Sequence, residues 1–286
     1  MGKIVIVGSG PAGCSAALYA ARAGQEVVVI SMGMGALSKA ELIQNYYGFE
    51  EGITGAELYR QGVAGAKAVG AEFITAEVVG LDYTGSLVVQ TTEGDYPADA
   101  VILATGAGRI APKIAGLAEH EGRGVSYCAT CDAFFYRGKT AAVLGSGEYA
   151  LHEVQALLPL AGKVILCTNG EPLTADFPEG VEICTEKLAA VEGEEKVSAL
   201  RLENGELLPV EGLFVALGVA GSAALARKLG APVENGRIVV DERMQTGIPG
   251  LYAAGDCTGG LLQVCKAVYE GALAATEAIK QIRGKK

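Results

Sequence analysis

The chain has 286 residues, of which 50% are hydrophobic and 20% charged, and it contains 41 glycines. Such a chain is long enough for two domains with cores of their own, and its composition is not that of a disordered protein. The formal net charge of −10 opposes attraction to nucleic acid and to anionic membrane surfaces, so we expect neither as a partner.

The sequence also argues against secretion and against a metal site. The chain enters a strand pattern at Lys3 without the charged region, apolar core and cleavage site of a signal peptide, and no apolar run has the length of a transmembrane helix. A total of 7 cysteines with only one C-x-x-C pair, together with 2 histidines, indicates neither a disulfide framework nor a metal-ligand set. We therefore expect a cytoplasmic protein without a bound metal.

The first 30 residues have the pattern of a β-turn-α-β nucleotide-binding unit. An apolar strand at residues 3–7 is followed at once by a glycine-rich loop at residues 8–13. A helical pattern then runs to Ala23, and a second apolar strand covers residues 27–30. The flanking elements make this loop much more specific for a dinucleotide than glycine spacing alone.

Each glycine of this first loop has a mechanical reason. Gly8 allows a tight turn, Gly10 lets backbone N–H groups approach a pyrophosphate, and Gly13 lets the helix pack on the strand. The positive end of the helix would then face the phosphates. Many such folds place an acidic residue on the adenosine ribose, but here the second strand ends in Ser31, so that contact must come from elsewhere.

The middle of the chain is strand-rich and then repeats the nucleotide-binding pattern. Residues 76–103 alternate strand patterns with turn signals at residues 84–86 and 93–95. A second unit consists of a strand at residues 139–144, a second glycine loop at residues 145–150 and a strand at residues 164–167. Two further short strand candidates precede the apolar run at residues 213–217, and a final helix is expected from about residue 262 to residue 282.

This order predicts an α/β fold of two Rossmann-like domains, each with the three-layer ββα arrangement. The second domain is inserted into the first. Turn formers at residues 110–112 and 219–221 are the best crossings between them. The predicted domains are residues 1–110 and 219–286, which together form one nucleotide-binding domain, and residues 111–218, which form the inserted domain.

The C-x-x-C pair, Cys128 and Cys131, has a chemistry that follows from its spacing. A partner thiol two residues on, at a loop-to-helix boundary, favours the thiolate of one cysteine and supplies an internal resolving thiol. Asp132 follows directly and is placed to exchange a proton with the leaving thiolate. The competing interpretation is a pair of ordinary buried thiols or half of a metal site.

Six motifs in one order resemble the bacterial thioredoxin reductases over nearly the whole chain. They are the first glycine loop at residues 8–13, residues 53–55, residues 104–106, the C-A-T-C-D motif at residues 128–132, the second glycine loop, and residues 254–256. The resemblance implies that the N- and C-terminal segments bind FAD, that the inserted domain holds NADPH beside the redox cysteines, and that the protein is a homodimer. It further implies that Cys131 contacts the flavin and that Cys128 attacks the disulfide of a thioredoxin-like partner.

The resemblance also implies a set of FAD-binding residues. Gly255 and Asp256 would contact the ribityl and phosphate region, and Asn45 and Gln263 would lie near the flavin ring. The full expected set is Gly8, Gly10, Pro11, Ala12, Gly13, Asn45, Ala104, Thr105, Gly106, Gly255, Asp256 and Gln263.

The other five cysteines fit packing better than catalysis. Cys14, Cys167 and Cys184 lie in helix or strand patterns, where cysteine commonly acts as a small buried apolar residue. Cys257 and Cys265 flank the flavin end of the chain, and a second redox role for them stays open.

The chain departs from the NADPH-using pattern in three places. Members that use NADPH carry a basic run for the 2′-phosphate after the second strand of the inserted domain, and here residues 168–170 read Thr-Asn-Gly. Glu148 and Tyr149 stand where small or neutral polar residues usually face the pyrophosphate. The segment after Thr174 is short and lacks the usual helix pattern. We therefore expect a domain that keeps its fold and cysteines but has lost ordinary NADPH binding.

These departures are similar to those of the ferredoxin-dependent flavin thioredoxin reductases. A plant-type ferredoxin at about −400 mV lies roughly 130 mV below thioredoxin at about −270 mV, on the order of 6 kcal/mol downhill for two electrons. We expect reduction of thioredoxin with electrons from ferredoxin. The alternatives are an unusual NADH or NADPH site, oxidation of a dithiol by oxygen, and a non-catalytic flavoprotein that acts as a redox sensor.

Overall fold

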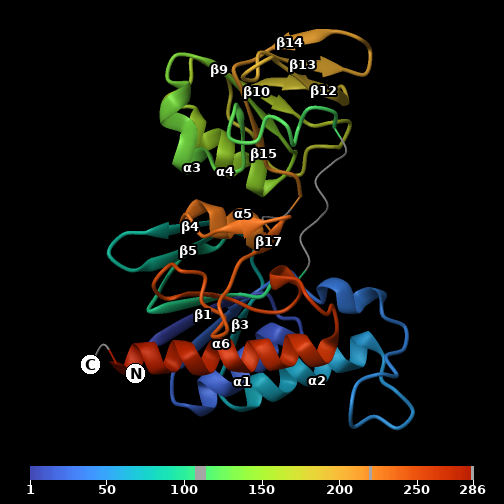
Figure 1. The fold of residues 1–286 in the computed structure, drawn as a ribbon, viewed down its shortest axis with the longest axis vertical. Coiled ribbons are helices and arrows are strands. Elements are labelled where there is room, and N and C mark those ends of the chain that lie inside the picture. Colours follow the sequence, from blue (N-terminus) through green and yellow to red (C-terminus); the bar gives the residue numbers. More distant parts are fainter. Residues whose placement is uncertain (107–113, 219–220, 285–286) are drawn as a thin grey trace. The chain divides into compact units, whose positions relative to one another are not determined.

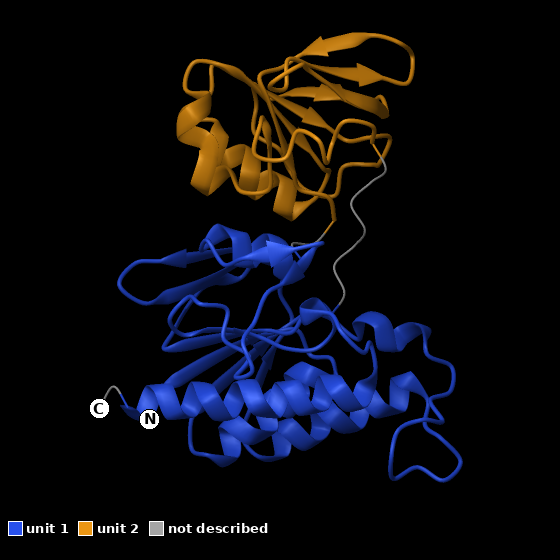
Figure 2. Ribbon diagram, viewed as in Figure 1, with its two compact units in different colours: residues 1–109, 221–286 blue, residues 110–220 orange. Residues whose placement is uncertain are grey.

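The computed structural model describes residues 1–106, 114–218 and 221–284. By its internal contacts the chain divides into unit 1, residues 1–109 with 221–286, and unit 2, residues 110–220 (Figure 2). The crossing expected at residues 110–112 lies outside the described residues, as do residues 219 and 220 of the second crossing.

Unit 1 is built on a parallel sheet with the strand order β18-β7-β1-β2-β3 (Figure 1). Its strands are β1 (Lys3–Val7), β2 (Glu26–Ile30), β3 (Glu72–Ile74), β7 (Ala100–Leu103) and β18 (Leu251–Ala253). β1, β2 and β7 are apolar and almost wholly buried, which is typical of parallel strands covered on both faces. Because β18 comes from the C-terminal part of the chain and pairs with β7, one sheet unites segments from both ends of the sequence.

Helices cover one face of this sheet and a small antiparallel sheet covers the other (Figure 1). The helical elements are α1 (Pro11–Arg22), α2 (Gly55–Ala68) and α6 (Val264–Gly284), with the 3₁₀ turns η1 (Gly35–Lys39) and η3 (Asp256–Thr258). The opposite layer consists of β4 (Val78–Tyr83), β5 (Leu87–Thr91) and β6 (Gly94–Ala98), followed later in the chain by α5 (Ser222–Lys228), β16 (Val233–Glu234) and β17 (Arg237–Ile238). Small residues let α1 and α6 pack closely, since a Cβ at Gly271 would lie 2.0 Å from the Ala12 carbonyl oxygen.

Unit 2 repeats the plan with the strand order β11-β10-β9-β15-β8. These parallel strands are β8 (Val125–Ser126), β9 (Thr140–Leu144), β10 (Lys163–Cys167), β11 (Glu182–Cys184) and β15 (Gly212–Val215). The helical elements are α3 (Ala129–Asp132), η2 (Ala133–Tyr136) and α4 (Glu148–Leu157), and the antiparallel layer is β12 (Leu188–Glu192), β13 (Ala199–Leu202) and β14 (Leu207–Pro209). The predicted fold class, two Rossmann-like ββα domains, is confirmed.

Most elements that differ from expectation are short, but the 14-residue helix α2 was also not predicted. Four strands, β11 to β14, precede β15 where two candidates were expected, because strands of three to five residues carry little periodicity. The predicted lack of a helix between β10 and β11 is confirmed. Among the described residues, no helix combines the length and apolar character needed to cross a membrane.

Candidate functional site

The first glycine loop has the geometry that its spacing predicts. Gly8 has a φ of 107°, and a Cβ there would lie 2.3 Å from the Ala104 carbonyl oxygen. A Cβ at Gly13 would lie 1.9 Å from the Gly8 carbonyl oxygen, so this glycine is needed for contact between helix and loop. A Cβ at Gly10 would meet no atom within 4 Å. The loop is therefore open at Gly10, where backbone N–H groups at the start of α1 can receive an anion.

A cavity of about 330 Å³ lies over this open loop in unit 1. All the residues expected to bind FAD line it except Gly13, which packs inside the loop. They come from the ends of β1 and β7, the start of α1, the segment between η1 and α2, the start of η3 and the residue before α6. Met34, Leu37, Leu42, Ile43 and Leu262 add an apolar wall that sequence reasoning did not identify. An apolar cleft with an anion-binding loop at one side suits a flat ring system joined to phosphates.

The two residues expected beside the ring system are in direct contact. The Asn45 side-chain amide donates a hydrogen bond to the side-chain oxygen of Gln263 at 2.8 Å, although 218 positions separate them in sequence. Residues 53–55, another motif of the resemblance, have a local role: the Thr54 hydroxyl caps α2 by accepting from the N–H of Glu57. Ser31, at the position of the usual acid, is within hydrogen-bond distance of Ser9, with 2.7 Å between the two hydroxyl oxygens.

The loop of residues 255–259 is held in place by ionic side chains that sequence reasoning missed. Lys266 on α6 donates to the carbonyl oxygens of Gly255 and Gly259, at 2.8 and 2.5 Å. Glu270, one turn later, accepts from the Gly255 N–H at 2.8 Å and pairs with Lys266 at 3.0 Å. The Lys/Glu spacing of four on a helix was the available signal. These contacts fix the backbone beside Asp256, whose own side chain lines the cavity.

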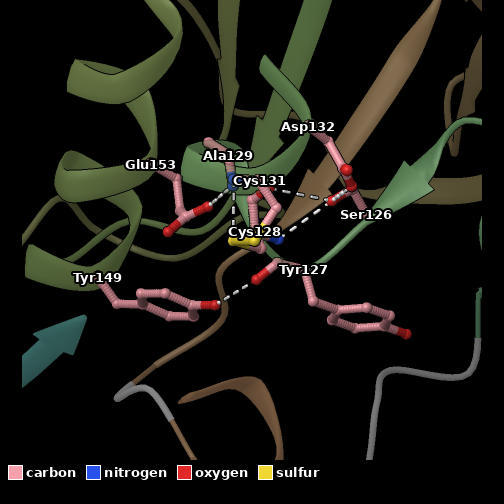
Figure 3. The surroundings of a disulfide bond; sticks show 8 residues. All are labelled: Ser126, Tyr127, Cys128, Ala129, Cys131, Asp132, Tyr149 and Glu153. Carbon is pink, nitrogen blue, oxygen red and sulfur yellow. Dashed lines mark hydrogen bonds between the residues drawn. A yellow bond between two sulfur atoms is a disulfide. The ribbon is translucent and has the colours of Figure 1, made fainter. Parts of the chain in front are cut away.

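Unit 2 carries the C-x-x-C pair as a disulfide between Cys128 and Cys131 (Figure 3). Cys128 has extended backbone geometry and caps α3, where its sulfur accepts a hydrogen bond from the Cys131 N–H at 3.1 Å. Such a donor favours the thiolate of Cys128 once the bond is reduced. Solvent exposure, in contrast, favours Cys131 as the accessible sulfur. Cys131 is exposed, whereas only 4% of Cys128 is accessible.

Asp132 is joined to the redox pair through Ser126. The Ser126 hydroxyl donates to a carboxylate oxygen of Asp132 at 2.6 Å, and its oxygen accepts from the Cys128 N–H at 3.1 Å. The carboxylate also adds to burial in raising the pKa of Tyr136. Asp132 is therefore a partly buried carboxylate one hydroxyl away from the backbone of Cys128.

Two residues of α4 complete the surroundings of the disulfide. The Glu153 side chain is only 1% exposed and accepts a hydrogen bond from the N–H of Ala129, which lies between the two cysteines (Figure 3). Tyr149, expected to face a pyrophosphate, is instead 2% exposed and donates from its hydroxyl to the Tyr127 carbonyl oxygen at 3.0 Å. Neither contact is visible from spacing, because α4 and the cysteines are joined only by the fold.

The second glycine loop differs from the first because another segment of the chain packs against it. A Cβ at Gly147 would lie 2.9 Å from the Thr174 hydroxyl oxygen. The Thr174 N–H donates to the Ser146 carbonyl oxygen at 2.8 Å. The short segment after β10 therefore folds back onto the loop that corresponds to the open loop of unit 1.

Lys187 lies beside residues 168–170, where NADPH-using relatives would carry the basic run. The Asn169 side chain accepts from the Leu188 N–H at 2.8 Å, and the aliphatic carbons of Lys187 lie 3.2 to 3.9 Å from a Cβ placed at Gly170. Lys187 is exposed and comes from the turn before β12.

Three of the remaining cysteines are buried, as expected of residues that pack in a core. They are Cys14, Cys167 and Cys257. Burial raises the pKa of Cys14 to about 12 and that of Cys257 to about 11. Cys167 is fully buried, and burial also raises its pKa, with further contributions from Cys184 and Glu182. Cys265 is exposed.

Comparisons with known proteins agree on one kind of relative. Residues 2–271 match the family described as pyridine nucleotide-disulphide oxidoreductase. The thioredoxin reductase of Aquifex aeolicus is 36% identical over 307 residues, which covers 99% of this chain and 94% of the relative. The chain is also similar to the crystal structure of the atypical thioredoxin reductase TRi from Desulfovibrio vulgaris Hildenborough. The two have 40% sequence identity and a TM-score of 0.93, with 99% of both chains covered. A ferredoxin-flavin thioredoxin reductase from Clostridium acetobutylicum is 35% identical, with a TM-score of 0.75 and coverage of 99% and 98%.

Proposed function

The chain belongs to the pyridine nucleotide-disulphide oxidoreductase family, and from this premise we propose that it is an FAD-dependent thioredoxin reductase that takes its electrons from ferredoxin rather than NADPH. The similarity to thioredoxin reductases along nearly the whole chain supports the flavin disulfide reductase activity. The donor is the finer part of the proposal, and it rests on the contrast between the two glycine loops.

That contrast is the observation that carries the proposal. In unit 1 the central glycine, Gly10, opens onto a cavity. In unit 2 the corresponding Gly147 is covered by Thr174, which is bonded to the loop itself. Glu148, in the first turn of α4, adds a carboxylate where a phosphate would need positive charge. The first loop is open at its central glycine, and the second has Thr174 against its central glycine.

The residues of the first cavity fit FAD. We infer that the loop around Gly10 holds the pyrophosphate, that Gly255 and Asp256 contact the ribityl and phosphate region, and that Asn45 and Gln263 contact the ring. Bound FAD supplies a redox group that exchanges electrons singly or in pairs, as an iron–sulfur donor requires. The protein supplies the rigid backbone of the loop, fixed by Lys266 and Glu270.

The reduced dithiol of unit 2 would carry the reaction with thioredoxin. The Cys128 sulfur, favoured as a thiolate by the Cys131 N–H, attacks one sulfur of the thioredoxin disulfide and forms a mixed disulfide. The Cys131 sulfur then attacks Cys128, which releases reduced thioredoxin and closes the bond between the two cysteines. The leaving thiolate takes up a proton, and Asp132 is placed to exchange one with it. Because Cys128 is buried beside exposed Cys131, the attack requires that Cys128 become accessible.

The surface next to the disulfide suits a protein partner. Phe134 and Phe135, two and three residues beyond the Cys131–Asp132 pair, are 66% and 68% exposed. The Arg137 guanidinium lies 5.3 Å from the ring centre of Phe134. Exposed aromatic residues beside a cation, directly next to a reactive disulfide, are typical of a docking surface for another protein.

A second candidate function is reduction by NADH or NADPH at an unusual site, and Lys187 is the observation that favours it. This side chain lies beside Gly170, in the region of the missing basic run, and would offer one point charge to a phosphate. If this candidate is correct, Lys187→Ala raises the apparent KM for NADPH, and reduced ferredoxin supports no turnover in either protein. The proposed function predicts negligible turnover with NADPH in both proteins.

The experiment that tests the activity is steady-state reduction of thioredoxin under anaerobic conditions. Reduced ferredoxin should support many turnovers for each FAD, and Cys131→Ser should support none. A protein that reduces thioredoxin only once for each disulfide would be a redox sensor and not an enzyme, which contradicts the proposal.

A further inference from the structure

Two cysteines that the sequence separates lie next to each other at the edge of the unit 2 sheet. Cys167 ends β10 and Cys184 ends β11, and the two residues are paired in the parallel register. Paired residues in parallel strands point to the same face, and both side chains pack into the same hydrophobic core cluster of unit 2. The Cys184 thiol is among the causes that raise the pKa of Cys167, after burial.

The spacing of the two strands is compatible with a disulfide. Neighbouring strands lie roughly 4.8 Å apart, inside the range of Cα separations found across disulfides, about 4.4–6.8 Å. β11 is a three-residue strand at the edge of the sheet, so it has one neighbouring strand and can shift to bring the sulfurs together. Neither sulfur is engaged in the disulfide between Cys128 and Cys131.

We propose that Cys167 and Cys184 form a second, reversible redox pair, which hydroperoxides convert from a dithiol to a disulfide. Cys184 is the attacking residue because it is partly exposed, whereas Cys167 is fully buried. Burial also raises the pKa of the Cys167 thiol, which leaves it as the resolving group that reacts only with its neighbour.

The reaction balances with hydrogen peroxide as the oxidant. The Cys184 thiolate attacks one peroxide oxygen, the O–O bond breaks, and the departing hydroxide takes up a proton to become water. This leaves a sulfenic acid on Cys184. The Cys167 sulfur then attacks the Cys184 sulfur, the S–O bond breaks, and the hydroxyl leaves as a second water with the Cys167 proton. Two thiols and one peroxide thus give one disulfide and two waters, and a dithiol reductant reverses the change.

The disulfide would join β10 to β11 beside the second glycine loop. The Cys167 carbonyl oxygen accepts from the Gly145 N–H at 3.0 Å, and the Cys184 carbonyl oxygen accepts from the Thr168 N–H at 2.9 Å. Oxidation would therefore fix the edge strand to the strand that supports this loop. The pair lies outside the residues assigned to thioredoxin reduction, so the proposal goes beyond the proposed function and does not depend on it.

The sequence makes the test direct, because trypsin releases residues 164–187 as one peptide that contains Cys167, Cys184 and no other cysteine. The full-length protein is treated with hydrogen peroxide, its free thiols are alkylated under denaturing conditions, and it is digested without reduction. We expect this peptide to be lighter by two hydrogens and to carry no alkyl group. Further cleavage after Glu179 should leave two pieces joined until a reductant is added.

Two comparisons make the result decisive. Cys265 is exposed and serves as an internal measure that oxidation has taken place. In Cys184→Ser, Cys167 should remain fully alkylatable after the same treatment, while buried Cys14 should behave identically in both proteins. If Cys265 is oxidised while the peptide keeps two alkylatable thiols, or if Cys184 reaches the sulfinic acid with Cys167 still free, the proposal is wrong.

Discussion

At the scale of single residues, Cys128 and Cys131 differ in surroundings that bear on their roles. A backbone donor reaches the Cys128 sulfur, whereas Cys131 is the exposed member of the pair. Both Cys128→Ser and Cys131→Ser should abolish turnover of thioredoxin, because the complete exchange needs both sulfurs. Only the variant that retains Cys131 should show a long-wavelength absorption band from a thiolate next to oxidised flavin. Identical flavin spectra, or activity that survives in either variant, would contradict the assigned roles.

Glu153 is a second residue whose environment predicts an effect. Replacing Glu153 by Gln keeps an acceptor for the Ala129 N–H and removes a buried carboxylate next to the redox pair. A negative charge opposes thiolate formation, so the variant should have a more stable dithiol. We expect its equilibrium with a glutathione buffer to shift toward the dithiol by about ten-fold, which corresponds to about 30 mV. An unchanged equilibrium in a folded Glu153→Gln would restrict Glu153 to a structural role.

Sequence reasoning succeeded for residues whose function depends on local spacing and failed for those brought together by folding. Gly8, Gly10 and Gly13 could be interpreted because loop, strand and helix are adjacent in the chain. Lys187 and Glu153 could not, since their contacts cross between elements that only the fold brings together. The same reason explains why Cys167 and Cys184 were interpreted as separate packing residues.

At the scale of elements, the two glycine loops provide a matched pair of variants. Gly10 and Gly147 both have backbone angles that other residues adopt, with φ of −70° and −120°. Gly10→Val should fold, since a Cβ meets no protein atom there, yet it should block a pyrophosphate and yield protein without FAD. Gly147→Val should displace only Thr174 and keep its FAD. The FAD content of the purified proteins measures this, and full retention by Gly10→Val would mean that the first loop does not bind the cofactor.

Elements with strong periodicity were predicted, and several others were missed. The strands at residues 3–7 and 26–30 and the last helix were found within about two residues, because apolar runs and helical periodicity are strong signals. The strands β3, β16, β17 and β18 and the 14-residue helix α2 were not predicted. The strands of the outer layer of unit 2 were undercounted, since their three to five residues leave alternation ambiguous. The cover over the second glycine loop was also out of reach, because the backbone contact of Thr174 depends on no particular side chain.

At the scale of the whole molecule, unit 1 contains an open cavity that suits a dinucleotide. Unit 2 contains the proposed redox disulfide and a glycine loop with Thr174 against it. The net charge of −10 means that an acidic ferredoxin would have to bind at a local group of cations. Raising the salt concentration should therefore slow electron transfer from ferredoxin more than it slows transfer from a small uncharged reductant, because only the protein donor depends on charge complementarity. Equal salt dependence, measured by flavin absorbance in a stopped-flow instrument, would exclude such a docking site.

The choice of electron donor is the central claim, and flavin absorbance measures it most directly. The FAD-loaded protein is titrated anaerobically with NADPH, NADH and reduced ferredoxin in turn, with Lys187→Ala as the control for an unusual nucleotide site. The account predicts that reduced ferredoxin bleaches the flavin and that millimolar NADPH and NADH do so negligibly in both proteins. Rapid, saturable bleaching by NADPH, weakened in Lys187→Ala, with none by ferredoxin, would contradict it.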